Sequence, residues 1–364
     1  MPLCSLTPVF RLTYLSLILM LITACVTTPT PEPTSTPDLL TPDPIPTPEP
    51  EVDAFTMNQR LAQTVNLANA LEAPNEGDWG LVLQEEYFQL VKEAGFTAVR
   101  IPIRWNTHAE LSAPYAIAPE FFERIDWAVE QALARRLVVI LDFHNYDEMM
   151  LAPVKNKDRF LGLWQQIAEH YQDYPNDVVF EFLNEPSGQL VASTWNKVIE
   201  SVLPLARASN PSRNIVIGPA EYNNLRALRD LKLPANDRHI IVAFHYYSPF
   251  QFTHQGAEWV VGADSWMGTN WKGSSAEQQS VAFDFDVVAQ WAKENNRPIF
   301  LGEFGAYSKA DMTSRALWTT FIAREAEKAG FSWGYWEFGS GFGVYDPVNK
   351  KWNEPLLQAL IPKP

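Results

Sequence analysis

The sequence predicts a (β/α)₈ (TIM) barrel formed by a single domain over residues 54–364. Two observations support this fold. Short β-type runs alternate with longer amphipathic helical patterns, giving eight strand–helix units in about 310 residues. The β-type runs are also continuously apolar, which is typical of parallel strands buried on both faces. An open, doubly wound sheet is the alternative, but no Gly-x-Gly-x-x-Gly follows the first run, and no phosphate loop occurs.

The predicted elements follow in order along the chain. Strands are expected at 64–68, 98–103, 138–143, 178–183, 214–217, 240–245, 299–302 and 333–337. Helices are expected at 85–94, 120–134, 160–171, 193–208, 278–295, 313–329 and 355–361, with a short piece at 223–231. The stretch 248–274 is too long for a simple connection and contains Trp259, Trp266 and Trp271. We therefore expect an elaborated loop at the carboxyl ends of the strands.

The N-terminal segment indicates export rather than fold. Residues 1–24 are expected to be a signal peptide, because Arg11 precedes an apolar run that is too short to span a bilayer. The run ends in Ile22-Thr23-Ala24-Cys25, which resembles a bacterial lipobox and predicts lipidation of Cys25. An ordinary secretory signal with an incidental cysteine is the alternative. Either interpretation places the protein outside the cytoplasm, on the cell surface or secreted.

Residues 25–53 are dominated by Pro, Thr and Glu and have few apolar side chains to bury. Such a segment is predicted to be a disordered linker. If Cys25 is lipidated, this linker would hold the domain away from the membrane, and the lipid would be the only membrane contact.

Composition excludes several classes of function. The net charge of -15 argues against a nucleic-acid partner. Cys4 and Cys25 are the only two cysteines, so a cysteine-based metal site is excluded. Aromatic residues make up 13% of the chain. Most should belong to the core, but Trp and Tyr also stack on the flat faces of sugars.

Polar and aromatic side chains follow nearly every predicted strand. In a barrel these strand ends converge on one opening, where active sites form. The residues concerned are Asn69, Glu72, Arg104, Trp105, His144, Asn145, Tyr146, Asn184, Glu185, His245, Tyr246, Tyr247, Glu303, Trp336 and Glu337, with Arg100 inside the second strand. Structural loops would more often carry Gly, Ser, Asp or Pro at these places.

Glu185 and Glu303 are the candidate catalytic pair. Each follows an apolar run, in Asn184-Glu185-Pro186 and in Gly302-Glu303-Phe304-Gly305. Retaining cleavage of a glycosidic bond needs one ionised carboxylate and one protonated carboxyl about 5–5.5 Å apart. Arg100 could keep one of them ionised. A buried structural ion pair is the alternative, and the two roles are compatible.

Several further residues are predicted to support such a site. Tyr247 could donate a hydrogen bond to the ionised carboxylate, and Asn184 could bind a sugar hydroxyl. His144 and His245 could orient hydroxyls or carboxylates, although a lone histidine is more often structural. No metal is expected, because the chain lacks His-x-x-x-His and His-Glu-x-x-His.

Two tryptophans have candidate roles in binding sugar. Trp336 is expected to form a stacking floor beneath the reactive sugar, with core packing as the alternative. Trp259 is expected to be a platform at a flanking subsite, unless it belongs to the core of its loop. Trp266 and Trp271 could serve either purpose.

Five segments at strand ends resemble glycoside hydrolase family 5. They are Ile101-Pro102-Ile103-Arg104-Trp105, Asp142-Phe143-His144-Asn145-Tyr146, Asn184-Glu185-Pro186, His245-Tyr246-Tyr247 and Gly302-Glu303-Phe304-Gly305. The segments 69–80, 252–259 and 339–346 are similar to the thermophilic bacterial (Thermotoga-type) endoglucanase/mannanase branch of that family. The resemblance covers residues 63–361.

The resemblance implies a (β/α)₈ barrel, retention of configuration and no cofactor. It implies that Glu185 is the acid/base and Glu303 the nucleophile. The residues expected to bind substrate or support the pair are Asn69, Glu72, Arg100, His144, Asn145, Asn184, His245, Tyr247, His254, Trp259 and Trp336. One departure is Asn145, which stands where members of this branch carry a second histidine, and which could alter the preference between glucan and mannan.

The sequence therefore predicts a monomeric retaining endo-β-1,4-glucanase whose partner is a polysaccharide, with mannan and mixed-linkage glucan as further substrates. A dedicated β-mannanase is the alternative within enzymes. A non-catalytic carbohydrate-binding barrel is the alternative of a different class, and the presence of both glutamates argues against it.

Overall fold

The computed structural model describes residues 51–363 of the 364-residue chain. The predicted signal peptide, Cys25 and residues 25–50 of the predicted linker lie outside the described residues. Residues 51–53 were also assigned to the linker. Glu51 and Val52 contact the barrel, because the Asn214 amide donates to the carbonyl of Val52 (2.7 Å) and His239 lies 2.7 Å from Glu51. Asp53 caps the helix at Ala54–Leu61. Among residues 51–363, no helix is both long enough and apolar enough to cross a bilayer.

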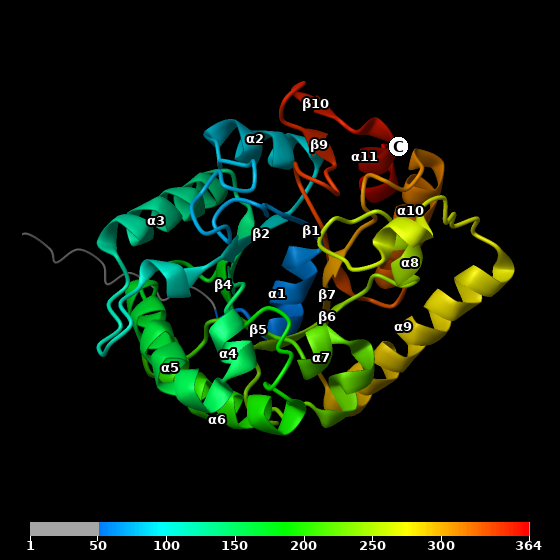
Figure 1. Ribbon diagram of the computed structural model, residues 1–364. Coiled ribbons are helices and arrows are strands. Elements are labelled where there is room, and N and C mark those ends of the chain that lie inside the picture. Colours follow the sequence, from blue (N-terminus) through cyan, green and yellow to red (C-terminus); the bar gives the residue numbers. More distant parts are fainter. Residues whose placement is uncertain (1–50, 364) are drawn as a thin grey trace, which may run out of the picture. The chain divides into compact units, whose positions relative to one another are not determined.

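Eight parallel strands close into a barrel in sequence order, which confirms the predicted fold class (Figure 1). The strands are β1 (Gln63–Asn66), β2 (Ala98–Ile103), β3 (Val138–Phe143), β4 (Val178–Glu181), β5 (Ile215–Ile217), β6 (Ile240–His245), β7 (Ile299–Phe304) and β8 (Ser332–Tyr335). β1 pairs with both β2 and β8, which closes the ring. Nearly every strand residue is buried, as the continuous apolar runs predicted.

Helices surround the barrel (Figure 1). They are α2 (Glu85–Ala94), α3 (Pro119–Ala134), α4 (Asp147–Leu151), α5 (Pro153–His170), α6 (Ala192–Ser209), α7 (Ala220–Asn223), α8 (Phe250–Thr253), α9 (Ser275–Asn295), α10 (Met312–Lys328) and α11 (Glu354–Leu360), with short 3₁₀ helices at Trp105–His108, Leu225–Asp230 and Ala263–Trp266. A small antiparallel pair, β9 (Tyr345–Asp346) and β10 (Lys351–Trp352), follows β8. The elaborated loop 248–274 contains α8 and one 3₁₀ helix.

Helix α1 (Ala54–Leu61) covers one end of the barrel and was not predicted. Met57 and Leu61 are fully buried and pack in one cluster with Ile140, Val179 and other inward side chains of the strands. Figure 1 shows α1 at the centre of the ring of strands. The amino-terminal end of the barrel is therefore closed, and the carboxyl ends of the strands remain as the place for a site.

Candidate active site

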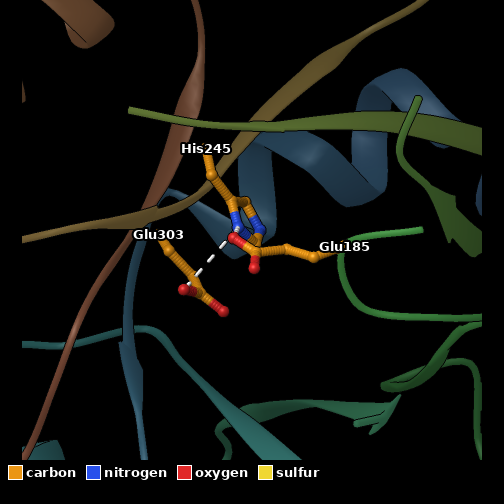
Figure 2. A group of neighbouring side chains, drawn as sticks. All are labelled: Glu185, His245 and Glu303. Atoms are coloured by element: carbon orange, nitrogen blue, oxygen red, sulfur yellow. Dashed lines mark hydrogen bonds and ion pairs between the residues drawn. The ribbon is translucent and has the colours of Figure 1, made fainter. Parts of the chain in front are cut away.

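Glu185 and Glu303 face each other at the carboxyl ends of β4 and β7 (Figure 2). One oxygen of each carboxylate and one ring nitrogen of His245 all lie within 4.8 Å of one another. This separation agrees with the ~5–5.5 Å of retaining glycosidases and is shorter than the ~6.5–9.5 Å that inverting enzymes need for an intervening water. The pair can therefore act directly on one glycosidic linkage.

A bulge in β7 positions Glu303. Phe244 of β6 pairs with Leu301, but the next residue, His245, pairs with Glu303, so Gly302 is an extra residue. A β-carbon on Gly302 would lie 2.9 Å from Nε2 of His245. The glycine therefore allows the imidazole to lie over the strand beside the two carboxylates. Glu303 itself is within β7, whereas the sequence predicted it just after the strand.

Arg100 is the fully buried centre of the charged network beneath the pair. Its guanidinium donates to Glu303 (2.8 Å) and, through two nitrogens, to Glu181 (2.7 and 2.9 Å). Asn66 and Asn184 accept further hydrogen bonds (both 2.9 Å), and the carboxylate of Asp142 lies 3.0 Å away. Burial alone would lower the pKa of Arg100, but the surrounding carboxylates raise it well above its usual value. The arginine is thus a permanent positive charge beside Glu303.

Glu303 accepts hydrogen bonds on both carboxylate oxygens. Arg100 donates to Oε1, and the Tyr247 hydroxyl donates to Oε2 at 2.9 Å. Burial and the neighbouring carboxylates raise the pKa of Tyr247 well above its usual value, so this phenol stays protonated and remains a donor. Two donors that both favour the charged form suit Glu303 to the ionised role.

Glu185 has the opposite environment. Burial raises the pKa of this carboxyl to about 7, in spite of the opposing effects of His144 and Arg100. Its side chain is nevertheless 28% exposed, compared with 6% for Glu303, so a bound molecule can reach it. The Nδ1 of His245 lies 2.7 Å from Oε1 of Glu185. A carboxyl that keeps its proton near neutral pH is suited to act as an acid.

His144 links the network to Asn184. Its Nδ1 contacts the carboxylate of Asp142, and its Nε2 lies 3.1 Å from the amide nitrogen of Asn184. Burial, with a contribution from Arg100, lowers the pKa of His144 to about 4, so the ring is neutral at physiological pH. Asn184 is thereby fixed next to Glu185.

The loop after β1 contains two of the predicted residues. The buried carboxylate of Glu72 accepts hydrogen bonds from the backbone N–H groups of Asn69 and Ala70, so it shapes this loop. The amide of Asn145 reaches the carbonyl of Glu72 at 3.4 Å. These three predicted residues therefore lie together, and Glu72 uses its carboxylate within the loop.

The predicted aromatic residues lie around the opening. Trp336 is half-buried and stacks parallel to His144, with ring centres 5.6 Å apart. Trp259 is 61% exposed and contacts Tyr307 edge-on. His254 is buried and stacks on Phe250, and Trp271 is fully buried against the core of the domain.

Four polar residues that the sequence analysis missed complete the network. They are Asn66 in β1, Asp142 in β3, Glu181 in β4 and Asn223 at the end of α7. Asp142 and Glu181 are charged residues in otherwise apolar strands, which is a signal that could have identified them. Asn66 gives no such signal, because β1 also contains Gln63 and Thr64. Asn223 follows the fifth strand, where the sequence offered no distinct pattern.

The cluster of Glu185, His245 and Glu303 does not fit a resident metal ion. Glu303 already accepts two hydrogen bonds from Arg100 and Tyr247. Arg100 is a permanent positive charge 2.8 Å from this carboxylate, and it would repel a cation bound there.

A closed parallel barrel with this carboxylate pair at its open end defines a glycoside hydrolase. Comparison with known families agrees: residues 59–341 match the family described as "Cellulase (glycosyl hydrolase family 5)". The chain belongs to glycoside hydrolase family 5.

Two relatives show where the chain lies within the family. It is similar to Endoglucanase H of Acetivibrio thermocellus, at 35% identity over 85% of this chain and 34% of that protein. Crystal structures of Thermotoga maritima Cel5A, one with mannotriose and another with cellobiose, match with 50% identity and a TM-score of 0.84 over 85% of this chain and 100% of theirs. The chain thus spans about a third of the length of Endoglucanase H.

Proposed function

We propose that this chain is a retaining endo-β-1,4-glucanase in which Glu303 is the nucleophile and Glu185 the acid/base. The observation that carries the proposal is the unequal environment of two carboxylates that lie within 4.8 Å. Arg100 and Tyr247 favour the ionised form of Glu303, whereas burial raises the pKa of Glu185 to about 7. The names of the relatives support β-1,4-glucan as the substrate.

The geometry supports double displacement. In the first step, Glu185 gives its proton to the glycosidic oxygen while a Glu303 oxygen attacks the anomeric carbon, which forms a glycosyl-enzyme and releases the aglycone. In the second step, the Glu185 carboxylate takes a proton from water, and the oxygen of that water displaces Glu303. Asn184, held by Arg100 and His144, is placed to bind the sugar 2-hydroxyl.

Two substitutions test the roles. Glu303→Ala and Glu185→Ala should each reduce hydrolysis of carboxymethyl-cellulose by about 10⁴-fold or more while thermal unfolding stays cooperative. Glu185→Ala should retain much more activity on 2,4-dinitrophenyl cellobioside, whose leaving group needs no acid. Glu200→Ala, an exposed acid on α6, is the matched control. Near-normal rates in either catalytic variant would refute the assignment, and binding without turnover in the wild type would favour a non-catalytic barrel.

The pH profile gives an independent test. Because Glu185 must be protonated in the first step, kcat/KM on carboxymethyl-cellulose should fall as the pH rises above about 7. This alkaline limb should disappear in Glu185→Ala when the dinitrophenyl substrate is used. An alkaline limb that persists unchanged would assign it to another group.

Mannan is the second candidate substrate. The Thermotoga relative was crystallised with mannotriose as well as with cellobiose, which supports testing both polymers. Turnover of carboxymethyl-cellulose, barley glucan and galactomannan should be compared. A preference for galactomannan of about tenfold would indicate a β-mannanase instead.

We also propose that the protein is a monomer attached to the membrane through a lipid on Cys25. The lipobox-like Ile22-Thr23-Ala24-Cys25 and the linker that follows support this location. Cys25→Ser should release the protein from the membrane fraction, and continued retention would count against lipidation. Gel filtration of the released protein tests the monomer.

A further inference from the structure

We propose that Asn223 is a positioning residue that fixes which nitrogen of His245 carries the proton, so that this histidine donates a hydrogen bond to Glu185. The inference rests on the acid/base role proposed for Glu185. Asn223 does not touch the substrate position. It acts through the chain Asn223–His245–Glu185.

The distances define this chain of hydrogen bonds. The amide nitrogen of Asn223 lies 3.1 Å from Nε2 of His245, and Nδ1 of the same ring lies 2.7 Å from Oε1 of Glu185 and 3.6 Å from Oε2 of Glu303. Asn223 is fully buried, and His245 is almost so. The contact between Asn223 and His245 is therefore shielded from water, which strengthens it.

The direction of each hydrogen bond follows from charge. A lone pair on Nδ1 would be repelled by the Glu303 carboxylate, 3.6 Å away, and by Glu185 once that residue has given up its proton, so Nδ1 carries the proton. Burial lowers the pKa of His245 to about 4, so the ring is neutral and has only one N–H group. Nε2 must then accept a hydrogen bond, and the amide N–H of Asn223 is the group that donates it.

The backbone that leads to Asn223 is conformationally strained. Glu221, Tyr222 and Asn223 all adopt left-handed conformations, with φ of 61°, 63° and 53°. Three such residues in succession are unfavourable for side chains with a β-carbon. The next residue, Asn224, bridges to His245 in parallel fashion. The strained segment is thus attached to the strand end that carries the histidine.

Gly218 leaves the space that the amide occupies. A β-carbon at this position would lie 2.1 Å from Oδ1 and 2.7 Å from Nδ2 of Asn223. The φ of Gly218 is outside the left-handed region, so alanine is permitted there by the backbone itself. Gly218→Ala therefore displaces the amide while leaving Asn223 unchanged.

Other charged or titratable groups also face His245 and Glu185. They are Glu303 on β7, Arg100 on β2, Asp142 on β3, Glu181 on β4, His144 after β3 and Tyr247 after β6. The amide of Asn223 is uncharged and does not titrate across the pH range of the experiment. A shift caused by its substitution can therefore be attributed to the state of His245.

Two substitutions should move the alkaline limb of kcat/KM in opposite directions. Asn223→Leu leaves Nε2 of His245 without a hydrogen-bond donor, which weakens the hydrogen bond from Nδ1 to the Glu185 carboxylate. The pKa of Glu185 should therefore rise, and the alkaline limb should move up by about half a pH unit to one unit. Asn223→Asp places a carboxylate beside Nε2, which accepts a hydrogen bond from an Nε2–H group and so favours the doubly protonated imidazolium. Positive charge beside Glu185 should then move the limb down by about one unit. In both variants kcat/KM should fall about tenfold.

Gly218→Ala should reproduce the upward shift, which keeps the test available if an Asn223 variant fails to fold. Gly339→Ala is the matched control, because a β-carbon there would have no neighbour closer than 3.5 Å. Shifts in the same direction for Asn223→Leu and Asn223→Asp, or no shift in either, would overturn the proposal.

The tautomer can be measured directly. In full-length protein labelled with ¹⁵N in its histidine rings, the His245 signal should report a protonated Nδ1 in the wild type and a mixture of tautomers in Asn223→Leu. A protonated Nε2 in the wild type would refute the proposal. Because this readout does not depend on turnover, it separates failure of this inference from failure of the proposed activity.

Discussion

Tyr246 and Tyr247 are neighbours at the end of β6, and their hydroxyls serve different parts of the molecule. The hydroxyl of Tyr247 donates to Glu303 at 2.9 Å, whereas that of Tyr246 donates to Asp284 of α9 at 3.1 Å. The alternation of side chains along an extended backbone accounts for this division. One phenol is part of the site, and the other joins the barrel to its outer helices.

Tyr247→Phe should reduce kcat, and it should lower the free energy of unfolding less than Tyr246→Phe does. A hydrogen bond to a charged group is worth about 1.5–3 kcal/mol, so kcat should fall on the order of 10- to 100-fold. Tyr246→Phe is the matched control, with near-normal kcat and a loss of about 1 kcal/mol in the free energy of unfolding. Equal losses of kcat in the two variants would show that the contact with Glu303 has no special role.

Stability should fall between pH 6.5 and pH 8. Burial raises the pKa of Glu72 to about 8 and that of Glu337 to about 7, so the folded state keeps protons that the unfolded chain has lost, and this stability disappears as the pH rises. The buried histidines His144, His245 and His254, whose pKa values are lowered to about 4, have the opposite slope, but only below 6.5.

Glu72→Gln should flatten this dependence by up to about 1.4 kcal/mol per pH unit. Urea unfolding at several pH values from 6.5 to 8 measures the slope. A slope unchanged by the substitution would mean that Glu72 is already ionised in the folded protein.

Gly305→Ala should disturb the active site through the backbone of Trp336 rather than through Glu185 or Glu303. A β-carbon at Gly305 would lie 2.1 Å from the carbonyl oxygen of Trp336, so the backbone around this tryptophan must shift. We expect a loss of about 1–3 kcal/mol in the free energy of unfolding and a clear loss of kcat/KM. Chemical denaturation and kinetics check both, and a fully stable, fully active variant would show that the close approach is easily relieved.

Trp259 and Trp271 belong to the same elaborated loop but should respond differently to truncation. Trp259 is 61% exposed, so Trp259→Ala should leave stability nearly unchanged and raise KM for long oligosaccharides about 2- to 10-fold. Trp271 is 1% exposed, so Trp271→Ala should cost about 3–5 kcal/mol of stability. Melting curves and KM measured on both variants distinguish a platform from a core residue. An unchanged KM for Trp259→Ala would remove its proposed role.

The strands were the most predictable part of the fold. The runs at β2, β3 and β6 were predicted to the residue because burial on both faces makes them continuously apolar. Helix α1 was missed, because its eight residues are only partly apolar and it is stabilised by closing the barrel rather than by its own pattern. In β7 the bulge keeps Glu303 within the strand, and a bulge depends on pairing with β6, which the sequence of β7 alone does not contain.

In the active site, too, what the local sequence carries could be predicted, and what depends on packing between elements could not. Strand-end positions were enough to nominate Glu185, Glu303, His245 and Tyr247, because a barrel brings those ends together. The hydrogen bond from Tyr247 to the ionised carboxylate was also predicted, and the structure has it with Glu303. Which carboxylate His245 contacts could not be predicted, since that depends on side-chain directions set by neighbouring strands. Asn223 illustrates the limit: its role follows from three left-handed residues and from the space at Gly218, neither of which has a pattern in the sequence.

The contacts of Glu51 and Val52 with His239 and Asn214 hold these two residues against the barrel. Both partners lie just before a strand, β6 and β5 respectively, at the end of the barrel that α1 closes. A tether or fusion partner joined ahead of Glu51 would therefore be attached at the end of the barrel that α1 closes. The opening that carries Glu185 and Glu303 is at the other end of the barrel, so the point of attachment itself would not obstruct a long polymer bound there.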